Sequence, residues 1–277
     1  AHPMALYDYE KIKDKKLKKQ IDKITVEHKD KKEFFIKELA EGIAQIAAAV
    51  YPKPTIVRFS DFKTNEYKNL IGGHLYEEQE PNPMMGFRGA SRYISPKYQP
   101  AFLMECEAIK RVRDVFGLKN VDVMVPFCRT LEEGTKVVEV MASAGLSREK
   151  AGIKIFVMCE IPANVILAEQ FLEIFDGFSI GSNDLTQLAL GLDRDNGTIS
   201  YIADERNEAV IELIREAARV CKAKEKYIGI CGEAPSNYPD FAEFLVDLEI
   251  ESMSLNPNVV LKTHLIVAEK EKNLHNK

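Results

Sequence analysis

The sequence has 277 residues, which is enough for one large α/β barrel or for two smaller domains. Hydrophobic residues make up 45% and charged residues 29%, and the net charge of −5 gives no general reason to expect nucleic acid or an anionic membrane as a partner. There is no run of about 20 apolar residues, no signal peptide and no CxxC pair among the five cysteines, so we expect a cytoplasmic protein with free thiols.

Short apolar runs along the chain predict β-strands. Six clear runs lie at residues 55–59, 121–127, 153–158, 177–180, 227–231 and 252–255. Most are apolar throughout rather than alternating, which is typical of parallel strands that are buried on both faces. A seventh, shorter strand is predicted at residues 85–89.

Longer amphipathic segments separate these runs and predict helices. In chain order they cover residues 7–25, 31–51, 100–116, 131–144, 163–175, 205–224, 238–248 and 257–271. The alternation of strands and helices favours a parallel α/β fold of the TIM (β/α)₈ type. Because the chain begins with a helix, we expect this barrel to lack its first strand. We expect a single domain over residues 1–277, N-terminally truncated, with a frayed tail at residues 270–277.

Polar residues gather where the apolar runs end. Glu160, Asp184 and Cys231 each follow such a run, and Arg58 lies inside one. In a parallel barrel all the strand C-termini share one face, and catalytic residues lie on that face. The sequence therefore predicts one site that is built from several strand ends.

Glu160 and Asp184 are the candidate metal ligands. A pair of carboxylates suits Mg²⁺, which takes one or two carboxylates together with waters and substrate oxygens. Each residue also has a structural alternative, because Glu160 could cap the helix that starts near Ala163 and Asp184 could be a helix N-cap. The pattern alone leaves both interpretations open.

Several arginines predict a site for a small polyanion. Arg58 lies within an apolar strand, where a buried guanidinium needs an anionic partner, although a structural salt bridge would also satisfy it. Arg88, Arg92 and Arg194 add donors whose planar fork fits carboxylate and phosphate oxygens. Asn183 could donate a hydrogen bond to the same ligand.

The cysteines differ in what their positions predict. Cys231 follows a strand, where it could be inert packing or an acid, base or nucleophile at the barrel mouth. Cys159 should face away from Glu160, because neighbouring side chains on a strand alternate. Cys106 and Cys221 lie in helical stretches, and we interpret these two and Cys159 as packing. The sequence contains neither a P-loop nor a strand–GxGxxG–helix unit.

Four longer motifs resemble one known family. They are NPMMGFRGASR (82–92), VMCEIPANVILAE (157–169), GFSIGSNDLTQLALGLDRD (177–195) and GICGEAPSNYPDFAEFL (229–245). They are similar to the C-terminal domain of the phosphoenolpyruvate (PEP)-utilising enzymes, which include PEP synthases, pyruvate phosphate dikinases and enzyme I of the bacterial sugar phosphotransferase system. The stretch IVRFSDFKTNEYKNLIGG (56–73) and the opening HPMAL resemble the synthases in particular.

The resemblance implies roles for individual residues. Glu160 and Asp184 would bind Mg²⁺, and Cys231 would exchange the proton at the methyl or methylene carbon. The substrate-binding residues that the resemblance implies are Arg58, Arg88, Glu160, Gly181, Ser182, Asn183, Asp184 and Arg194. One departure is Glu233, where synthases often have Gln.

The reaction that the resemblance implies is Mg²⁺-dependent phosphoryl transfer between a phosphohistidine on another domain and pyruvate or PEP. The sequence lacks the first-strand GLLRxEF-like motif, a phosphohistidine motif and an ATP-binding domain. We therefore expect these parts in a longer parent, and we do not expect the chain alone to run the full reaction. The alternatives are a dikinase or enzyme I domain, or a non-catalytic fragment for ligand binding or dimerisation, since family barrels often form homodimers.

Overall fold

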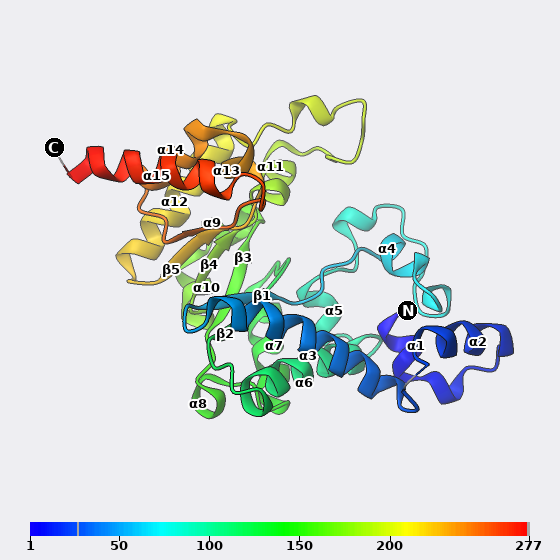
Figure 1. The fold of residues 1–277 in the computed structure, drawn as a ribbon. Helices are drawn as coiled ribbons and strands as arrows, with labels where there is room; N and C mark the ends of the chain where they lie inside the picture. Colours follow the sequence, from blue (N-terminus) through cyan, green and yellow to red (C-terminus); the bar gives the residue numbers. More distant parts are fainter. Residues whose placement is uncertain (27, 276–277) are drawn as a thin grey trace. The chain divides into compact units, whose positions relative to one another are not determined.

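A computed structural model describes residues 1–26 and 28–275 of the chain. The chain, which we expected to form one domain, divides into two compact units (Figure 1). Unit 1 consists of Ala1–Pro126 and Glu132–Ile155, and unit 2 of Phe127–Leu131 and Phe156–Lys277. Each unit contains parallel strands and helices, which confirms the predicted parallel α/β class.

Unit 1 begins with helices rather than with a strand, as predicted. They are α1 (Pro3–Tyr7), α2 (Lys15–Ile24) and α3 (Lys31–Val50). The predicted helix at residues 7–25 is interrupted because Asp14 has extended backbone, and its carboxylate accepts hydrogen bonds from the first amides of α2. Leu17 and Ile21 of α2 pack into a small apolar cluster with Ala5, Leu6 and Ile12.

The two strands of unit 1 are parallel neighbours. Strand β1 (Thr55–Arg58) pairs with β2 (Val121–Val125), and Thr55 lies opposite Val121. The remaining helical elements of this unit are α4 (Thr64–Asn69), η2 (Gly73–Leu75), η3 (Pro83–Met85), α5 (Ala90–Ile94), α6 (Gln99–Lys110), η4 (Arg111–Val115), α7 (Leu131–Ser143, its first residue in unit 2) and α8 (Arg148–Ala151).

The prediction of a seventh strand at residues 85–89 is wrong. Pro83 starts the short 3-10 helix η3, which ends at Met85. Gly89 has a φ of 58°, a left-handed value that an extended strand does not contain. The segment is therefore a turn that leads into α5.

Unit 2 carries four consecutive parallel strands. They are β3 (Ile155–Cys159, its first residue in unit 1), β4 (Gly177–Ile180), β5 (Tyr227–Ile230) and β6 (Ser252–Met253), hydrogen-bonded in that order. All residues of β3 and β4 are buried, as their continuous apolar runs predict. The helical elements of this unit are α9 (Pro162–Ile166), α10 (Ala168–Ile174), α11 (Ser182–Leu190), η5 (Ser200–Ile202), α12 (Glu208–Ala223), α13 (Ala234–Asn237), α14 (Pro239–Asp247) and α15 (Val260–His275).

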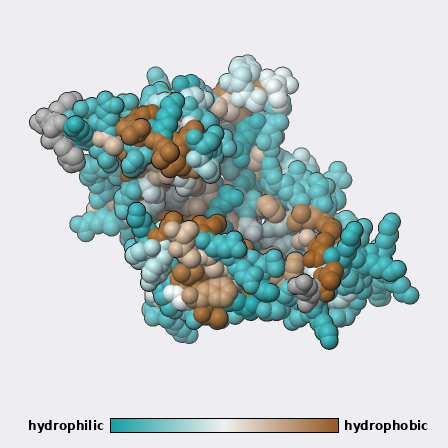
Figure 2. Space-filling model, in the orientation of Figure 1, coloured by the Kyte–Doolittle hydropathy of each residue, from teal (hydrophilic) through white to brown (hydrophobic). Residues whose placement is uncertain are grey.

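Helix α15 ends the described chain. It starts at Val260, three residues after the predicted start at Pro257, and it continues to His275. The expected frayed tail at residues 270–277 is thus helical up to His275, and its last two residues lie outside the described part. Val260, Leu261 and Leu265 of this helix are exposed, and Figure 2 shows hydrophobic surface over it. Within residues 1–26 and 28–275, no helix has the length and apolar character needed to cross a membrane.

Candidate active site

Three strands of unit 2 end side by side, and predicted site residues follow them. Strand β3 meets β4 at Cys159 and Ile180, and β4 meets β5 at Ile180 and Ile230. One backbone hydrogen bond extends each pairing, from Gly181 N to Cys159 O (3.1 Å) and from Cys231 N to Ile180 O (2.9 Å). The strand-end residues of this unit therefore share one edge of the sheet, as parallel strands predict.

Glu160 is the more deeply buried of the two predicted metal ligands, at 1% exposure. Its Oε1 accepts a hydrogen bond of 2.7 Å from the amide of Phe127, whose φ of 45° is unusual for a bulky residue. The N-cap of α9 is Ile161, so the alternative that Glu160 caps this helix is wrong. A strained backbone instead directs an N–H at the carboxylate.

Asn164, which was not among the predicted site residues, holds the turn that carries Glu160. Its Oδ1 accepts hydrogen bonds from the amides of Glu160 (3.3 Å) and Ile161 (3.0 Å), and its Nδ2 donates to Cys128 O (2.8 Å). The side chain is completely buried. The available sequence signal for this role was a polar Asn in the otherwise apolar start of a helix.

Gly181 lets the next turn approach Glu160. A Cβ on Gly181 would lie 2.6 Å from Glu160 Oε2 and 2.7 Å from its Cβ, closer than real Cβ atoms come. The backbone of the Gly181 turn therefore lies directly against the Glu160 carboxylate, and this approach requires glycine.

Asp184 is buried in the first turn of α11, a helix that the sequence analysis did not predict. Gly181 is the N-cap of this helix, so the alternative that Asp184 is an N-cap is wrong. The first turn is the electropositive end of a helix, where a carboxylate is stabilised. Asn183, partly exposed beside it, accepts a hydrogen bond of 3.3 Å from the amide of Glu233.

Ser182 contacts a residue that the sequence analysis missed. Its Oγ donates a short hydrogen bond to Oε1 of Glu205, and both side chains are buried. Burial raises the pKa of Glu205, while the Ser182 hydrogen bond acts in the opposite direction. Glu205 precedes α12 in a polar stretch, so only its position in space distinguishes it from the surrounding surface carboxylates.

Cys231 differs from the other four cysteines, which are all buried in the structure. Its Sγ is 3.5 Å from the carbonyl oxygen of Ile180, to which it can donate a hydrogen bond. A Cβ on the following residue, Gly232, would overlap Oγ of Ser182. The Cys231 turn and the Ser182 turn therefore touch. Cys159, Cys106 and Cys221 are packing residues, as predicted.

Arg194 is exposed on the segment that follows α11, and its amide donates a hydrogen bond of 3.1 Å to the buried Gln187. The predicted arginines Arg58 and Arg88 belong to unit 1. Arg88 is buried and forms a two-point ion pair with Asp61, with distances of 3.1 and 2.5 Å. The expectation that Arg58 is buried is wrong, because it is the last residue of β1 and its side chain reaches solvent.

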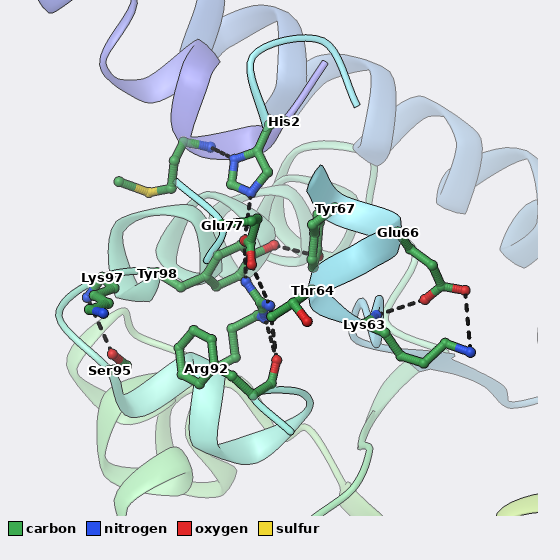
Figure 3. A network of polar contacts seen from close by, with 12 residues as sticks. His2, Lys63, Thr64, Glu66, Tyr67, Glu77, Arg92, Ser95, Lys97 and Tyr98 are labelled. Atoms are coloured by element: carbon green, nitrogen blue, oxygen red, sulfur yellow. Dashed lines mark hydrogen bonds and ion pairs between the residues drawn. The ribbon is translucent and has the colours of Figure 1, made fainter. Parts of the chain in front are cut away.

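Arg92 is buried in a network of unit 1 that Figure 3 shows from close by. Its guanidinium pairs with Glu77 at 2.5 and 3.0 Å, and Nε2 of His2 lies 2.9 Å from the same carboxylate. Tyr76 stacks on the His2 ring. Burial lowers the pKa of His2, although Glu77 opposes this. The Arg92 guanidinium therefore has Glu77 as a structural partner.

Among residues 1–26 and 28–275, no group of three or more His, Cys, Asp or Glu side chains is arranged to hold a metal ion. A pocket of about 850 Å³ lies beside β6, lined by residues that include Ile250, Met253 and His264. None of the predicted site residues lines it.

The family profile described as "PEP-utilising enzyme, PEP-binding domain" matches residues 19–272. A phosphoenolpyruvate synthase from Synechocystis sp. is 56% identical over 99% of this chain and 34% of its own length. The synthase from Helicobacter pylori is 54% identical over the same shares, and that from Escherichia coli is 53% identical over 98% of this chain and 34% of its length. The chain thus spans about a third of the curated relatives it matches.

Among solved structures, a malate synthase from Haloferax volcanii aligns with a TM-score of 0.50. The two chains are 12% identical, and the alignment covers 82% of this chain and 55% of the other. At this identity the similarity concerns the fold alone, and it agrees with the predicted barrel-type α/β architecture.

Proposed function

Because the chain belongs to the PEP-utilising enzymes and matches their PEP-binding domain, we propose that it is the PEP- and pyruvate-binding domain of a phosphoenolpyruvate synthase. The observation that carries the proposal is the meeting of Glu160, the Gly181–Asp184 turn and Cys231 at adjoining strand ends of unit 2. The phosphohistidine and ATP-binding domains are the proposed partners, supplied by the part of a synthase that this chain does not span.

Glu160 and Asp184 fit Mg²⁺ as the proposed cofactor. Both are buried carboxylates that follow neighbouring parallel strands, and Gly181 brings the second turn against the first carboxylate. Hard oxygen donors in a pair, with room left for water and substrate oxygens, are what Mg²⁺ takes in enzymes. The ion, when bound, supplies polarisation of the carbonyl oxygen of pyruvate.

We propose that the remaining site residues bind the phosphate and carboxylate oxygens of the substrate. The α11 N-terminus presents backbone N–H groups, and Ser182 and Asn183, which lie in its first turn, are proposed substrate-binding residues. Arg194 is the proposed cationic donor of unit 2, and Arg58 and Arg88 are proposed as substrate-binding residues on unit 1. The two-point pairing of Arg88 with Asp61 fixes the plane of its guanidinium, so it would meet a ligand in a defined orientation.

Cys231 is the proposed proton carrier at C3. In the direction of PEP formation, the thiolate takes a proton from the methyl group, the C–H electron pair becomes the C2–C3 double bond, and the carbonyl π pair moves to the oxygen. The enolate oxygen then bonds to phosphorus while the P–N bond of the phosphohistidine breaks. The histidine leaves as neutral imidazole when its other ring nitrogen carries a proton. The support is that Cys231 is partly exposed at a strand end, whereas the other cysteines are buried.

Calorimetric titration of the chain with PEP, with and without Mg²⁺, tests the proposal. We expect binding that requires Mg²⁺ and that is lost in Asp184→Ala. PEP binding that requires no Mg²⁺ and is unchanged in Asp184→Ala would contradict the assigned site. Absence of binding by a folded wild-type chain would contradict the proposal that this chain holds the PEP site by itself.

A further inference from the structure

Glu205 is hydrogen-bonded to one of two touching turns, which carry the proposed metal-binding and proton-transfer groups. Its carboxylate is 7% exposed and accepts a hydrogen bond from Oγ of Ser182, next to Asn183. The backbone of Ala234, three residues after Cys231, opposes the rise in the pKa of the same carboxylate. This acidic side chain therefore fixes Ser182 at the start of α11, against the turn that follows β5.

The two turns are in close contact at Ser182, the residue that Glu205 holds. The amide of Glu233 donates to Oδ1 of Asn183 at 3.3 Å, and Gly232 packs against Ser182 so tightly that a Cβ would overlap its Oγ. A change in the Ser182 rotamer would therefore displace the turn that contains Cys231. The acceptor that selects the Ser182 rotamer is Glu205.

Side-chain contacts of a neighbouring residue also fix the backbone around Glu205. The guanidinium of the next residue, Arg206, lies 3.9 Å from the ring centre of Tyr238 and pairs with Asp204 at 3.0 Å. These contacts lie at the end of the segment that begins after α11 and carries Arg194, whose positive charge also acts on Glu205. Glu205 is thus placed by its neighbours rather than by its own hydrogen bonds alone.

We infer that Glu205 is a positioning residue of this site, which holds the Ser182–Asp184 turn and the Cys231–Ala234 turn in the arrangement that ligand binding needs. The inference rests on the proposed function. The Glu205 carboxylate is the acceptor of the Ser182 hydroxyl. Alanine would leave this buried donor without an acceptor, and glutamine would keep an oxygen that can accept from it.

A double-mutant cycle tests whether Glu205 acts through Ser182. The variants are Glu205→Ala, Ser182→Ala and the double variant, with Glu208→Ala as the matched control because Glu208 is exposed in the first turn of α12. Calorimetry gives the Kd for PEP with Mg²⁺. Intact-mass analysis gives the rate at which iodoacetamide alkylates Cys231, which requires no ligand.

We expect Glu205→Ala to weaken PEP binding at least about tenfold, as for other residues that orient a metal site, and to change the Cys231 alkylation rate. The double variant should bind within about twofold of the weaker single variant, because both substitutions break the same contact. Glu208→Ala should match wild type in both measurements. Glu205→Gln, which keeps the volume, should lie between wild type and Glu205→Ala, and it replaces the alanine variant if that variant does not fold.

The inference is overturned if folded Glu205 variants bind PEP and react with iodoacetamide as wild type does. If wild type itself does not bind PEP, the proposed function fails, and the alkylation rates alone decide the inference. In that case a changed rate in the Glu205 variants, beside an unchanged rate in Glu208→Ala, supports the coupling of the two turns. Equal rates in all variants overturn it.

Discussion

Two buried glutamates, Glu77 in unit 1 and Glu205 in unit 2, have pKa values shifted in opposite directions. Burial alone would raise the pKa of Glu77, but hydrogen bonds and charge from His2 and Arg92 outweigh it, and its pKa is lowered. Burial also raises the pKa of Glu205, and there the Ser182 hydroxyl and the Ala234 backbone offset burial only in part. The sign of the shift depends on whether the carboxylate is directly hydrogen-bonded to a positively charged group.

This difference in pKa distinguishes Glu77, which belongs to a structural ion pair, from Glu205, which lies at the candidate site. Glu77 and Arg92 satisfy one another inside a cage of aromatic rings, including Tyr67 and Phe87. Glu205 accepts a hydrogen bond from Ser182, whose turn touches the turn that contains Cys231. Carboxylates with raised pKa values are candidates for functional sites, whereas the loss of one partner of a buried ion pair destabilises a fold.

The strongest test of the structural pair is Arg92→Ala. Arg92 is 1% exposed, and its loss leaves the Glu77 carboxylate buried without the guanidinium. We expect the free energy of unfolding to fall by about 3–5 kcal/mol, measured by urea denaturation. Lys97→Ala, which removes an exposed ion pair with Glu78, is the control and should change little. Equal effects of the two substitutions would contradict the structural role of Arg92.

Glu105 shows that the direction of the pKa shift depends on whether the carboxylate is paired with a cation, and not on the unit in which it lies. It lies in unit 1, fully buried, and accepts a hydrogen bond of 3.0 Å from the Ser60 amide. Burial raises its pKa to about 7. The folded chain therefore holds this proton more tightly than the unfolded chain does, so the stabilisation is present at low pH and is lost as the pH rises toward 7.

Glu105→Gln cannot ionise and should remove this pH dependence. Between pH 4.5 and pH 8, the stability of wild type relative to Glu105→Gln should fall by roughly 3 kcal/mol, in proportion to the shift in pKa. Urea denaturation across this pH range measures the difference. Parallel stability profiles for the two proteins would show that Glu105 does not titrate in this way.

Gly232→Ala probes the contact between the two turns of unit 2. The new Cβ would overlap Oγ of Ser182, and we expect a loss of about 1–3 kcal/mol in stability together with weaker PEP binding. Gly197→Ala is the control, because a Cβ there meets no atom within 4 Å. Thermal unfolding compares the two variants, and equal melting temperatures would contradict the close approach of the turns.

The smallest expected effect is on thiol reactivity. Burial raises the pKa values of the Cys106, Cys159 and Cys221 thiols, whereas Cys231 is partly exposed. Iodoacetamide should therefore add to the native protein mainly at Cys231, and the Cys231→Ser variant should remain unmodified on the same time scale. Rapid labelling of the variant at another cysteine would contradict the exposure described.

Apolar and polar patterns along the chain predicted the features that depend on local sequence, namely the strands and the polar residues that follow them. The six strands and the position of Glu160 and Cys231 after them follow from apolar runs that end in polar residues. The burial of Arg58 was predicted wrongly, because a run of apolar neighbours does not show where a strand ends. The strand at residues 85–89 failed because Pro83 and Gly89 set the backbone there.

Contacts between distant residues could not be predicted in this way. His2 and Glu77 are 75 positions apart, and Ser182 and Glu205 are 23 apart. No periodicity connects such pairs, because the fold, rather than the local sequence, brings them together. The resemblance to a known family implied metal ligands and a proton carrier, but it pointed to neither Asn164 nor Glu205, which hydrogen-bond residues beside them.

Binding of Mn²⁺ in place of Mg²⁺, followed by electron paramagnetic resonance in the presence of PEP, tests most directly whether Glu160 and Asp184 hold one divalent ion. We predict one Mn²⁺ per wild-type chain, and affinity weakened at least about tenfold in Glu160→Gln and in Asp184→Asn alike. Unchanged Mn²⁺ affinity in both variants would contradict the account, because the ion would then lie elsewhere.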